Sequence, residues 1–299
     1  MTTGPAIVSH EPRFAEGPVW CPATGDDPAS VVCTSVSEGA LYRIDVATGA
    51  CTLLAVTLGG ANGATPCTDG GFLVTQNGGL DFAAIGLFED PPVCAPAQPG
   101  LQRVGPGGQV EHLTPDVLQA PNDLVVARDG TVLFTDPPAW PLPDDARGRV
   151  WAYARDGSLS LLADGFWYPN GIGIERDGTV IVVENGLMGR PVFGLVRIDA
   201  AGRRDLFAAP TGDGFCFDVD GRLYLAGGIH GITVLEPDGT VAEELEIAGR
   251  GVTTNCCFGG DDLRTLFATE AVPGGVVCWE HMPTPGAPVL AWPGPASPA

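Results

Sequence analysis

The sequence predicts an all-β fold, a six-bladed β-propeller with four antiparallel strands in each blade. Three observations lead to this prediction. The 43 glycines and 28 prolines of the 299 residues are spread between short apolar runs, as many tight turns require. X-Asp-Gly turns recur along the chain, each flanked by β-branched or aromatic residues. Two hairpins fall within each repeat of about 40 to 50 residues, the period of a propeller blade, which leaves room for six blades.

Two interleaved sets of hairpins make up the repeat. In the first set the turn glycines Gly70, Gly130, Gly178 and Gly221 are separated by 60, 48 and 43 residues. The hairpins of this set span residues 67–76, 127–136, 175–184, 218–227 and 259–270. Those of the second set span residues 42–55, 103–114, 153–163, 197–208 and 235–246. An X-Asp-Gly or similar turn with alternating apolar flanks predicts a β-hairpin in each segment.

Other segments depart from the repeat. The first spacing is stretched by the proline-rich residues 88–102, which we expect to form a loop, and residues 81–88 are the best helical candidate. We expect one domain over residues 1–299, with an irregular tail from about residue 283 to 299. The first strands, around residues 31–36, are expected to pair with the last, around 275–281, because this pairing closes the ring and removes exposed sheet edges.

Composition excludes several classes of partner. The formal net charge is −21, from 36 acidic and 15 basic residues, and every basic residue is arginine. Such an acidic surface repels phosphate backbones and anionic lipids, so we expect no binding to nucleic acid or membrane. The absence of lysine excludes a lysine Schiff base and a P-loop lysine. Nine cysteines without zinc-site spacing, and an N-terminus without signal-peptide features, predict reduced thiols in a cytoplasmic protein.

Four short stretches interrupt the hairpin rhythm where a blade begins. They are AEGPVW (15–20), APNDLVV (120–126), YPNGIGI (168–174) and GDGFCFD (212–218). Each places a side chain with a hard oxygen before an apolar inner strand, namely Glu16, Asn122, Asn170 and Asp213. Because the inner strands of a propeller all begin near one mouth of the central channel, we expect these side chains to converge. Two carboxylates and two amide carbonyls suit Ca²⁺, Mg²⁺ or Mn²⁺ better than a soft metal.

A purely structural interpretation of these stretches is also available. Asn-Gly and Asp-Gly are the commonest turn dipeptides, and Asn-Asp after proline also favours turns. Taken alone, each stretch is better explained as a turn than as a ligand. Their shared phase, each ahead of an inner strand, is what favours a common site.

The same stretches, together with TNCCFGGDDLRTLFAT (254–269), resemble the SMP-30/gluconolactonase/luciferin-regenerating family, from Glu16 to about His281. EGPVW combined with TNxxFGG is the specific part of this resemblance. The resemblance implies a six-bladed propeller that binds one divalent metal ion (Ca, Mg, Mn or Zn) through Glu16, Asn170 and Asp213. Asn122 would lie beside the metal and contact the substrate or a water. The implied activity is metal-dependent hydrolysis of a small-molecule lactone or ester.

The implied chemistry assigns further roles. The metal would polarise the lactone carbonyl and stabilise the oxyanion that develops during ring opening. Asp213 is the expected catalytic base or nucleophile, because the Asp-Gly turn lets its carboxylate project toward the channel, whereas Glu16 is expected to remain an anchoring ligand. The further candidates for substrate binding are Trp140, Trp167, Glu184 and His230. Packing between blades is the alternative role for the two tryptophans, and a structural role the alternative for His230.

One position departs from the family's pattern. Sugar lactonases of the family usually carry an arginine two residues before the asparagine of the PND motif, and this chain has Ala120 there. The departure puts a polyol substrate in doubt. Aromatic side chains near the mouth then favour a less hydroxylated lactone or ester.

Three alternatives remain. A phosphotriesterase-type hydrolase would use the same oxygen ligands, so the sequence does not separate it from a lactonase. A metal-free propeller of the strictosidine-synthase type would not need Glu16, Asn170 and Asp213 together. A binding module is the third; WD-type repeats would show Gly-His and Trp-Asp pairs in each blade, and the sequence has none. The sequence makes no prediction of oligomeric state.

Overall fold

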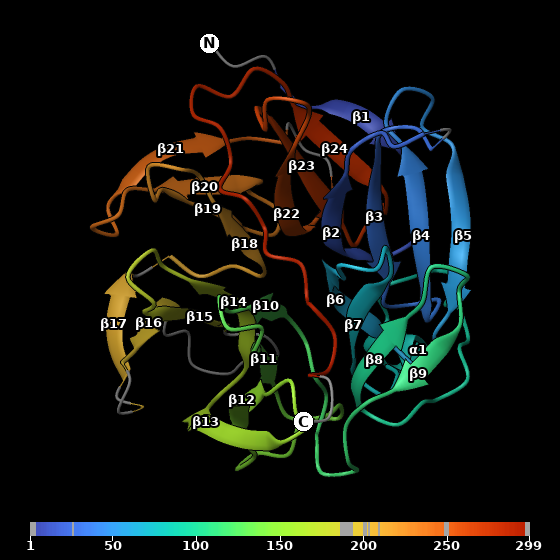
Figure 1. Cartoon of the computed structure of the whole chain (residues 1–299), viewed down its shortest axis with the longest axis vertical. Coiled ribbons are helices and arrows are strands. Elements are labelled where there is room, and N and C mark those ends of the chain that lie inside the picture. Colours follow the sequence, from blue (N-terminus) through green and yellow to red (C-terminus); the bar gives the residue numbers. More distant parts are fainter. Residues whose placement is uncertain are drawn as a thin grey trace.

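The chain forms six four-stranded antiparallel sheets arranged in a ring, which confirms the predicted six-bladed propeller (Figure 1). The computed structural model describes residues 4–25, 27–185, 194–199, 202, 204–208, 210–247 and 251–296. In blades 1 to 5 the four strands follow one another in the chain. Blade 6 combines three strands from the C-terminal part of the chain with one from the N-terminal part.

The strands of each blade are as follows. Blade 1 contains β2 (Ala15–Cys21), β3 (Ser30–Ser35), β4 (Ala40–Asp45) and β5 (Cys51–Val56). Blade 2 contains β6 (Ala61–Pro66), β7 (Phe72–Gln76), β8 (Gly100–Val104) and β9 (Val110–His112). Blade 3 contains β10 (Leu124–Val126), β11 (Val132–Asp136), β12 (Gly148–Tyr153) and β13 (Leu159–Phe166). Blade 4 contains β14 (Pro169–Ile174), β15 (Val180–Glu184), β16 (Gly194–Ile198) and β17 (Arg204–Ala208). Blade 5 contains β18 (Phe215–Phe217), β19 (Leu223–Ala226), β20 (Ile232–Leu235) and β21 (Val241–Leu245). Blade 6 contains β22 (Thr253–Gly259), β23 (Thr265–Glu270), β24 (Val276–Trp279) and β1 (Ala6–Ser9).

Both predicted sets of hairpins are confirmed. The first set joins the two innermost strands of a blade, such as β10 with β11, and the second set joins the two outer strands, such as β12 with β13. The turn between β10 and β11 shows why Asp-Gly recurs. Gly130 has φ +85°, which favours glycine, and the Oδ1 of Asp129 accepts a hydrogen bond from the backbone N–H of Thr131 at 2.9 Å. In the 197–208 hairpin, residues 200, 201 and 203 lie outside the described residues.

Ring closure differs from the prediction. The strand that completes blade 6 is β1, whose Ala6 and Ile7 pair with Cys278 and Val277 of β24. Residues 31–35, predicted for this role, lie in β3, between β2 and β4 of blade 1. Every residue of β3 is buried, as suits an interior strand, whereas β1 is partly exposed, as suits a sheet edge. The prediction was wrong because it assigned the most apolar early run to closure.

The helix and the loop that depart from the repeat are both shorter than predicted. The helix expected over 81–88 is a single turn, α1 (Phe82–Ile85), which ends at Gly86 in the left-handed conformation. The loop expected over 88–102 ends earlier, because Gly100 already pairs with Gln76. Residues 283–296, which we name the C-terminal strap, contain no strand but form backbone bridges such as Asp218 to Gly286 and Cys67 to Trp292.

The core is divided among the blades. Among the described residues, buried apolar side chains form one cluster between each pair of neighbouring blades. The inner strands contact one another around the central channel. No helix in the described ranges has the length and apolar character needed to cross a bilayer. The stability of the ring therefore rests on face-to-face packing of blades, which leaves the inner ends of the strands free for polar residues.

Candidate functional site

The first residues of the inner strands take equivalent places around one end of the channel, which we name the site mouth. The ladder of β2 with β3 is irregular after Glu16, and the same shift follows the start of β6, β14 and β22. In blades 3 and 5 the matching residue lies two residues before the inner strand and donates its backbone N–H to the second strand, Asn122 to the carbonyl of Thr135 and Asp213 to that of Ala226. The six side chains at this position are those of Glu16, Asn62, Asn122, Asn170, Asp213 and Thr254. The predicted convergence of Glu16, Asn122, Asn170 and Asp213 at the start of the inner strands is therefore seen in the structure.

Threonines of the second strands fix three of these positions from the neighbouring blade. The hydroxyl of Thr135 donates to the backbone carbonyl of Asn170 at 2.7 Å. Thr34 and Thr75 donate in the same way to the carbonyls of Asn62 and Asn122. Each bond joins one blade to the start of the next. In each case, the next-to-last residue of the second strand is a threonine that holds the asparagine at the start of the next blade.

Three asparagines at the mouth carry buried acceptors without a donor. The side chains of Asn62, Asn122 and Asn170 are 6%, 6% and 2% exposed. The Oδ1 atom of each has no hydrogen-bond partner among the described residues. Buried polar atoms are nearly always satisfied, so three such oxygens in one ring position indicate a site for a ligand or ion.

Two carboxylates stand in the same ring. Glu16 is buried, and its Oε2 accepts a hydrogen bond from the backbone N–H of Gly17 at 2.8 Å. Burial, followed by the charges of Asp213 and Asp123, raises the pKa of Glu16 well above its usual range. Burial and Asp123 likewise raise the pKa of Asp213 to about 8, against a lowering contribution from the Asn170 side chain. Carboxylates this close and this poorly solvated favour a proton or a cation between them.

One residue further along the inner strands, two side chains meet across the channel. The Nδ2 of Asn255 in blade 6 donates to both carboxylate oxygens of Asp123 in blade 3, each at 3.0 Å. Burial raises the pKa of Asp123 to about 7, while the bond from Asn255 lowers it. The matching residues of the other blades are the glycines 17, 63, 171 and 214. A Cβ at Gly214 would lie 2.1 Å from Cγ of Asn255, so glycine is required there for the pair to form.

Buried polar groups at the ends of second strands hold the segments that lead into the site. Asp136 accepts from the backbone N–H groups of Gln119 and Ala120, both at 2.8 Å. Glu184 accepts from the N–H of Trp167 at 2.5 Å. Glu184, predicted as a substrate-binding residue, thus has a clear structural contact. Its carboxylate positions the segment that precedes Asn170.

The other residues predicted to bind substrate, Trp140, Trp167 and His230, differ in how exposed they are to solvent. Trp167 is half-buried, and the guanidinium of Arg147 lies over its ring, 3.4 Å from the centroid. Trp140 is half-buried in the connection between β11 and β12. His230 is exposed in the turn between β19 and β20, and its ring has no hydrogen bond to any described residue. The structure therefore brings Glu16, Asn122, Asn170 and Asp213 together at the site mouth, and Trp167 lies three residues before Asn170 in the chain. Among the described residues, no contact links Trp140 or His230 to these four residues.

Sequence reasoning missed several residues of this region. Asn62 occurs in an Asn-Gly pair at the same phase as Asn170, so its signal was present in the sequence. Asp123 differs from the glycine of other blades, which was a weaker signal, and Asn255 was quoted only as part of a motif. Tyr168 also lies near the carboxylates, because burial, then Asp213 and Glu16, raise its pKa.

The donor set mixes carboxylates and amides. Among the described residues, no three His, Cys, Asp or Glu side chains are grouped so that they could hold a metal. The atoms at the mouth that fit an ion are instead the carboxylates of Glu16 and Asp213 and the free amide oxygens of Asn122 and Asn170. All are hard oxygen donors, which suit divalent cations such as Ca²⁺ and Mg²⁺.

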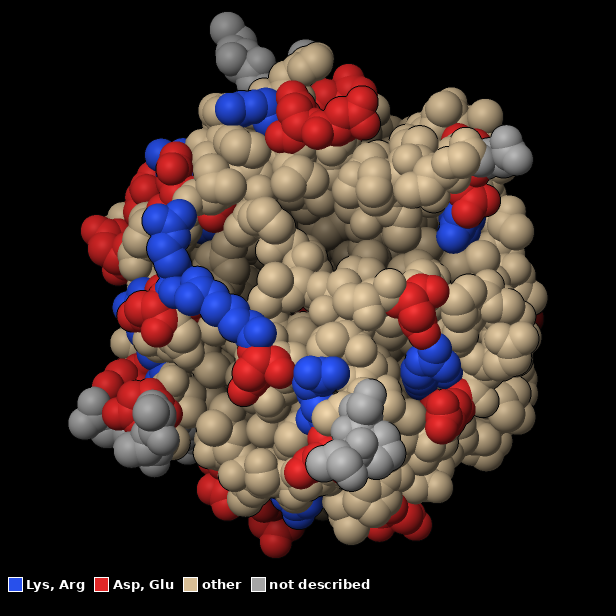
Figure 2. Space-filling model, viewed as in Figure 1, with Lys and Arg blue, Asp and Glu red and all other residues tan. Residues whose placement is uncertain are grey.

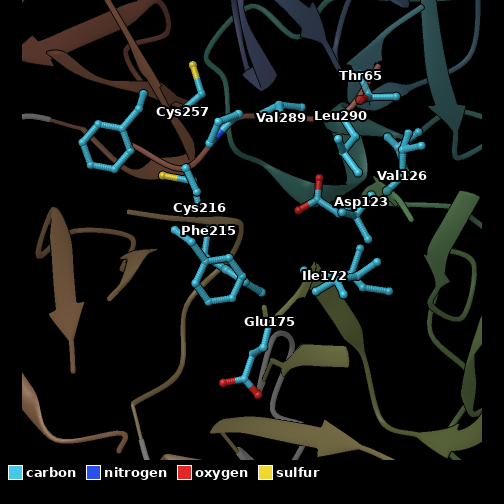
Figure 3. Close-up of a pocket in the computed structure, with 18 of the residues that line it drawn as sticks. Thr65, Asp123, Val126, Ile172, Glu175, Phe215, Cys216, Cys257, Val289 and Leu290 are labelled. Atoms are coloured by element: carbon cyan, nitrogen blue, oxygen red, sulfur yellow. The ribbon is translucent and has the colours of Figure 1, made fainter. Parts of the chain in front are cut away.

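The opposite end of the channel opens into a cavity of about 1260 Å³. Apolar side chains such as Ile172, Phe215 and Leu290 line it, and the carboxylate of Asp123 points into it (Figure 3). The C-terminal strap crosses this end of the ring (Figure 1), and the face is hollowed near its centre (Figure 2). This cavity is therefore not at the site mouth, and the Asp123–Asn255 pair lies between the two.

Comparison with known proteins supports one family. The family described as SMP-30/Gluconolactonase/LRE-like region matches residues 14–272. A pentonolactonase, XacC, of Haloferax volcanii is 26% identical over 279 residues, which cover 89% of this chain and 84% of that protein. A gluconolactonase of Zymomonas mobilis is 28% identical over 173 residues; this match covers 51% of this chain and about half, 48%, of that protein. The crystal structure of a calcium-binding protein, regucalcin, from Agrobacterium tumefaciens has a TM-score of 0.75 at 19% identity, with 97% of each chain covered. At that identity the structural likeness supports the fold alone.

Proposed function

The chain belongs to the SMP-30/gluconolactonase/LRE-like family, and from this premise and the site mouth we propose that it is a metal-dependent lactonase. The observation that carries the proposal is the convergence of two carboxylates with raised pKa values and buried amide oxygens that lack donors. The pentonolactonase and gluconolactonase relatives support a lactone as the substrate.

One divalent ion fits the mouth. Glu16, Asn170 and Asp213 would hold it, and Asn122 would lie beside it. A cation there would satisfy the free amide oxygens and remove the repulsion that raises the carboxylate pKa values. The oxygen-only donors favour Ca²⁺, Mg²⁺ or Mn²⁺ over Zn²⁺. The ion would make the lactone carbonyl more electrophilic and stabilise negative charge on its oxygen.

Asp213 and Glu16 have different roles in the proposed reaction. Asp213 is half-buried, so its carboxylate can reach both the mouth and a substrate. It takes a proton from the water that adds to the lactone carbonyl carbon. When the ring C–O bond breaks, the same proton passes to the ring oxygen, which leaves as a hydroxyl. Glu16 is tied to the N–H of Gly17 and fully enclosed, which suits an anchoring role.

The test combines metal content with lactone hydrolysis. We expect about one divalent ion per chain and loss of activity on chelation, with recovery when Ca²⁺, Mg²⁺ or Mn²⁺ is added. Asp213→Asn keeps the shape of the side chain and is expected to lower kcat roughly 10²- to 10⁴-fold. Asp129→Asn, in an exposed hairpin turn at the other end of the ring, is the matched control and should retain full activity.

Other results would assign the site differently. A protein that binds no metal and hydrolyses no lactone would refute the proposal and favour a metal-free propeller or a binding module. Metal-dependent hydrolysis of a phosphotriester in preference to all lactones would refute the substrate class and favour a phosphotriesterase.

A further inference from the structure

Among the described residues, Arg147 and Arg197 each lie within 4 Å of the centroid of an aromatic ring, and they differ in what their N–H groups contact. Arg197 lies over Phe207 at 3.6 Å, and its Nε and one terminal nitrogen are bonded to both carboxylate oxygens of Glu175, each at 2.7 Å. Arg147 lies over Trp167 at 3.4 Å. Within the described ranges Arg147 forms no ion pair, and its side chain donates only to the backbone carbonyl of Ala146. Arg197 therefore has Nε and one terminal nitrogen engaged by Glu175 and by the carbonyl of Pro237, whereas Arg147 has more donors left without a partner among the described residues.

The backbone of Arg147 lies between two segments of the site mouth. Its carbonyl accepts a hydrogen bond from Nε2 of Gln119 at 3.0 Å, and Gln119 precedes Asn122 by three residues. The next residue, Gly148, is packed against Pro169, since a Cβ at Gly148 would lie 2.3 Å from Cδ of the proline. Pro169 directly precedes Asn170. Arg147 is thus held close to the segments that carry Asn122 and Asn170, two of the three asparagines whose amide oxygens lack donors.

The aromatic platform is itself fixed. The backbone N–H of Trp167 is bonded to the buried carboxylate of Glu184 at 2.5 Å. A guanidinium that lies flat on an indole keeps its planar edge directed outward, where it donates in a fixed fork. Gln119 and Arg147 are followed in the chain by Ala120 and Gly148, which have no polar side chain. The arrangement presents a rigid donor edge at the rim of a mouth built mostly from oxygen acceptors.

We propose that Arg147 is the specificity-determining residue of the site, and that its donor edge binds the oxygen-bearing substituents of a polyhydroxylated lactone. This inference rests on the proposed lactonase function and deepens it by naming the substrate class. The recognised chemistry is a pair of oxygens remote from the ring carbonyl, supplied by two hydroxyls or by a carboxylate. It opposes the expectation of a less hydroxylated substrate, which depended on Ala120.

The experiment compares three lactones that differ only in these substituents. Glucono-δ-lactone carries hydroxyls, a glucarolactone adds a carboxylate, and δ-valerolactone carries neither. For Arg147→Ala we expect kcat/KM for the hydroxylated lactones to fall roughly tenfold to a hundredfold, mainly through KM, as loss of hydrogen bonds to a charged donor predicts. For δ-valerolactone kcat/KM should change less than about twofold, because that substrate has no partner for the lost donor. A much larger loss for the glucarolactone would identify the carboxylate as the recognised group, and equal losses would identify the hydroxyls.

Two more variants sharpen the result. Arg147→Lys keeps the charge but loses the planar fork, so it should behave like Arg147→Ala. Arg128→Ala removes an exposed arginine at the opposite end of the channel and should leave all three rates unchanged. Equal rates for the three lactones in wild type, or an unchanged ratio in Arg147→Ala with normal thermal unfolding, would overturn the inference and leave the lactonase proposal intact. A wild type that hydrolyses none of the three would overturn both.

Discussion

The two ends of the central channel contrast in chemistry and in construction. The site mouth gathers carboxylates and amides, several of them buried without partners. The opposite end is a mostly apolar cavity lined in part by Val289 and Leu290 of the C-terminal strap (Figure 3). The strap also carries Trp292, which is 1% exposed. The mouth is made by one repeated position in each blade, whereas the strap has no counterpart in the repeat.

The contrast separates function from stability. Unsatisfied polar groups cost folding free energy, and they persist where a ligand compensates them. The C-terminal strap instead stabilises the fold, because its backbone is hydrogen-bonded to Val219 of blade 5, Leu263 of blade 6 and Pro66 of blade 2. The indole of Trp292, in the strap, packs in the apolar cluster between blades 2 and 3. We therefore expect changes at the mouth to affect activity more than stability, and changes at the strap to do the opposite.

The largest effect is expected from Glu16→Gln at the mouth. The substitution should lower lactone kcat/KM on the order of 100-fold or more, because an anchoring charge is lost. The same change should raise the unfolding free energy of the metal-free protein by about 1–2 kcal/mol, since burial and two neighbouring carboxylates disfavour the ionised glutamate. Urea unfolding of the chelated protein and a lactone assay measure the two effects.

Glu243→Gln, an exposed position in β21, is the control for this pair of measurements and should change neither. A chelated Glu16→Gln protein that is less stable than wild type would contradict the contrast between the two ends.

The second effect is expected at the strap. Trp292→Ala should lower the unfolding free energy by about 3–5 kcal/mol, because it empties a fully buried site. At temperatures where the variant is folded, its kcat/KM should stay within about twofold of wild type. Trp292→Phe should cost less, since the indole Nε1 has no hydrogen-bond partner within the part of the chain that the structure describes.

Val289→Ser tests the strap where it is exposed. Val289 is 65% exposed and should change stability by less than about 0.5 kcal/mol. A folded Trp292→Ala protein with a large loss of kcat would show that the two ends are coupled.

The smallest effect is expected at a threonine that joins two blades. The hydroxyl of Thr135 donates to the carbonyl of Asn170 at 2.7 Å and accepts from the N–H of Asp123 at 3.1 Å. Thr135→Val should cost about 1–2 kcal/mol of stability by leaving these groups without a partner, and should lower metal affinity a few-fold. Calorimetric metal titration and thermal unfolding measure the two quantities.

Thr135→Ser retains the hydroxyl and should restore most of both properties. If serine were more harmful than valine, packing of the threonine methyl group rather than the hydrogen bonds would hold Asn170 in place.

Much of the architecture could be predicted because it depends on residues that are close together in the sequence. Asp-Gly turns and their apolar flanks specify hairpins within about ten residues, and the hairpins recur at the period of a blade. Glu16, Asn122, Asn170 and Asp213 could be grouped because equal phase in a closed repeat means equal height in the ring. Asn62 had the same phase and could have been found by the same reasoning.

The sequence by itself determined the hairpins, the six repeats and which residues begin the inner strands, since these depend on neighbours in the chain. Tertiary structure alone decided which distant residues touch. It joined Asp123 to Asn255, 132 residues apart, across the channel, and it chose β1 rather than β3 to close the ring. It also set Arg147 on Trp167, which lies in the connection from blade 3 to blade 4. Such contacts depend on how twisted sheets pack side by side, and no local pattern in the chain records the partner.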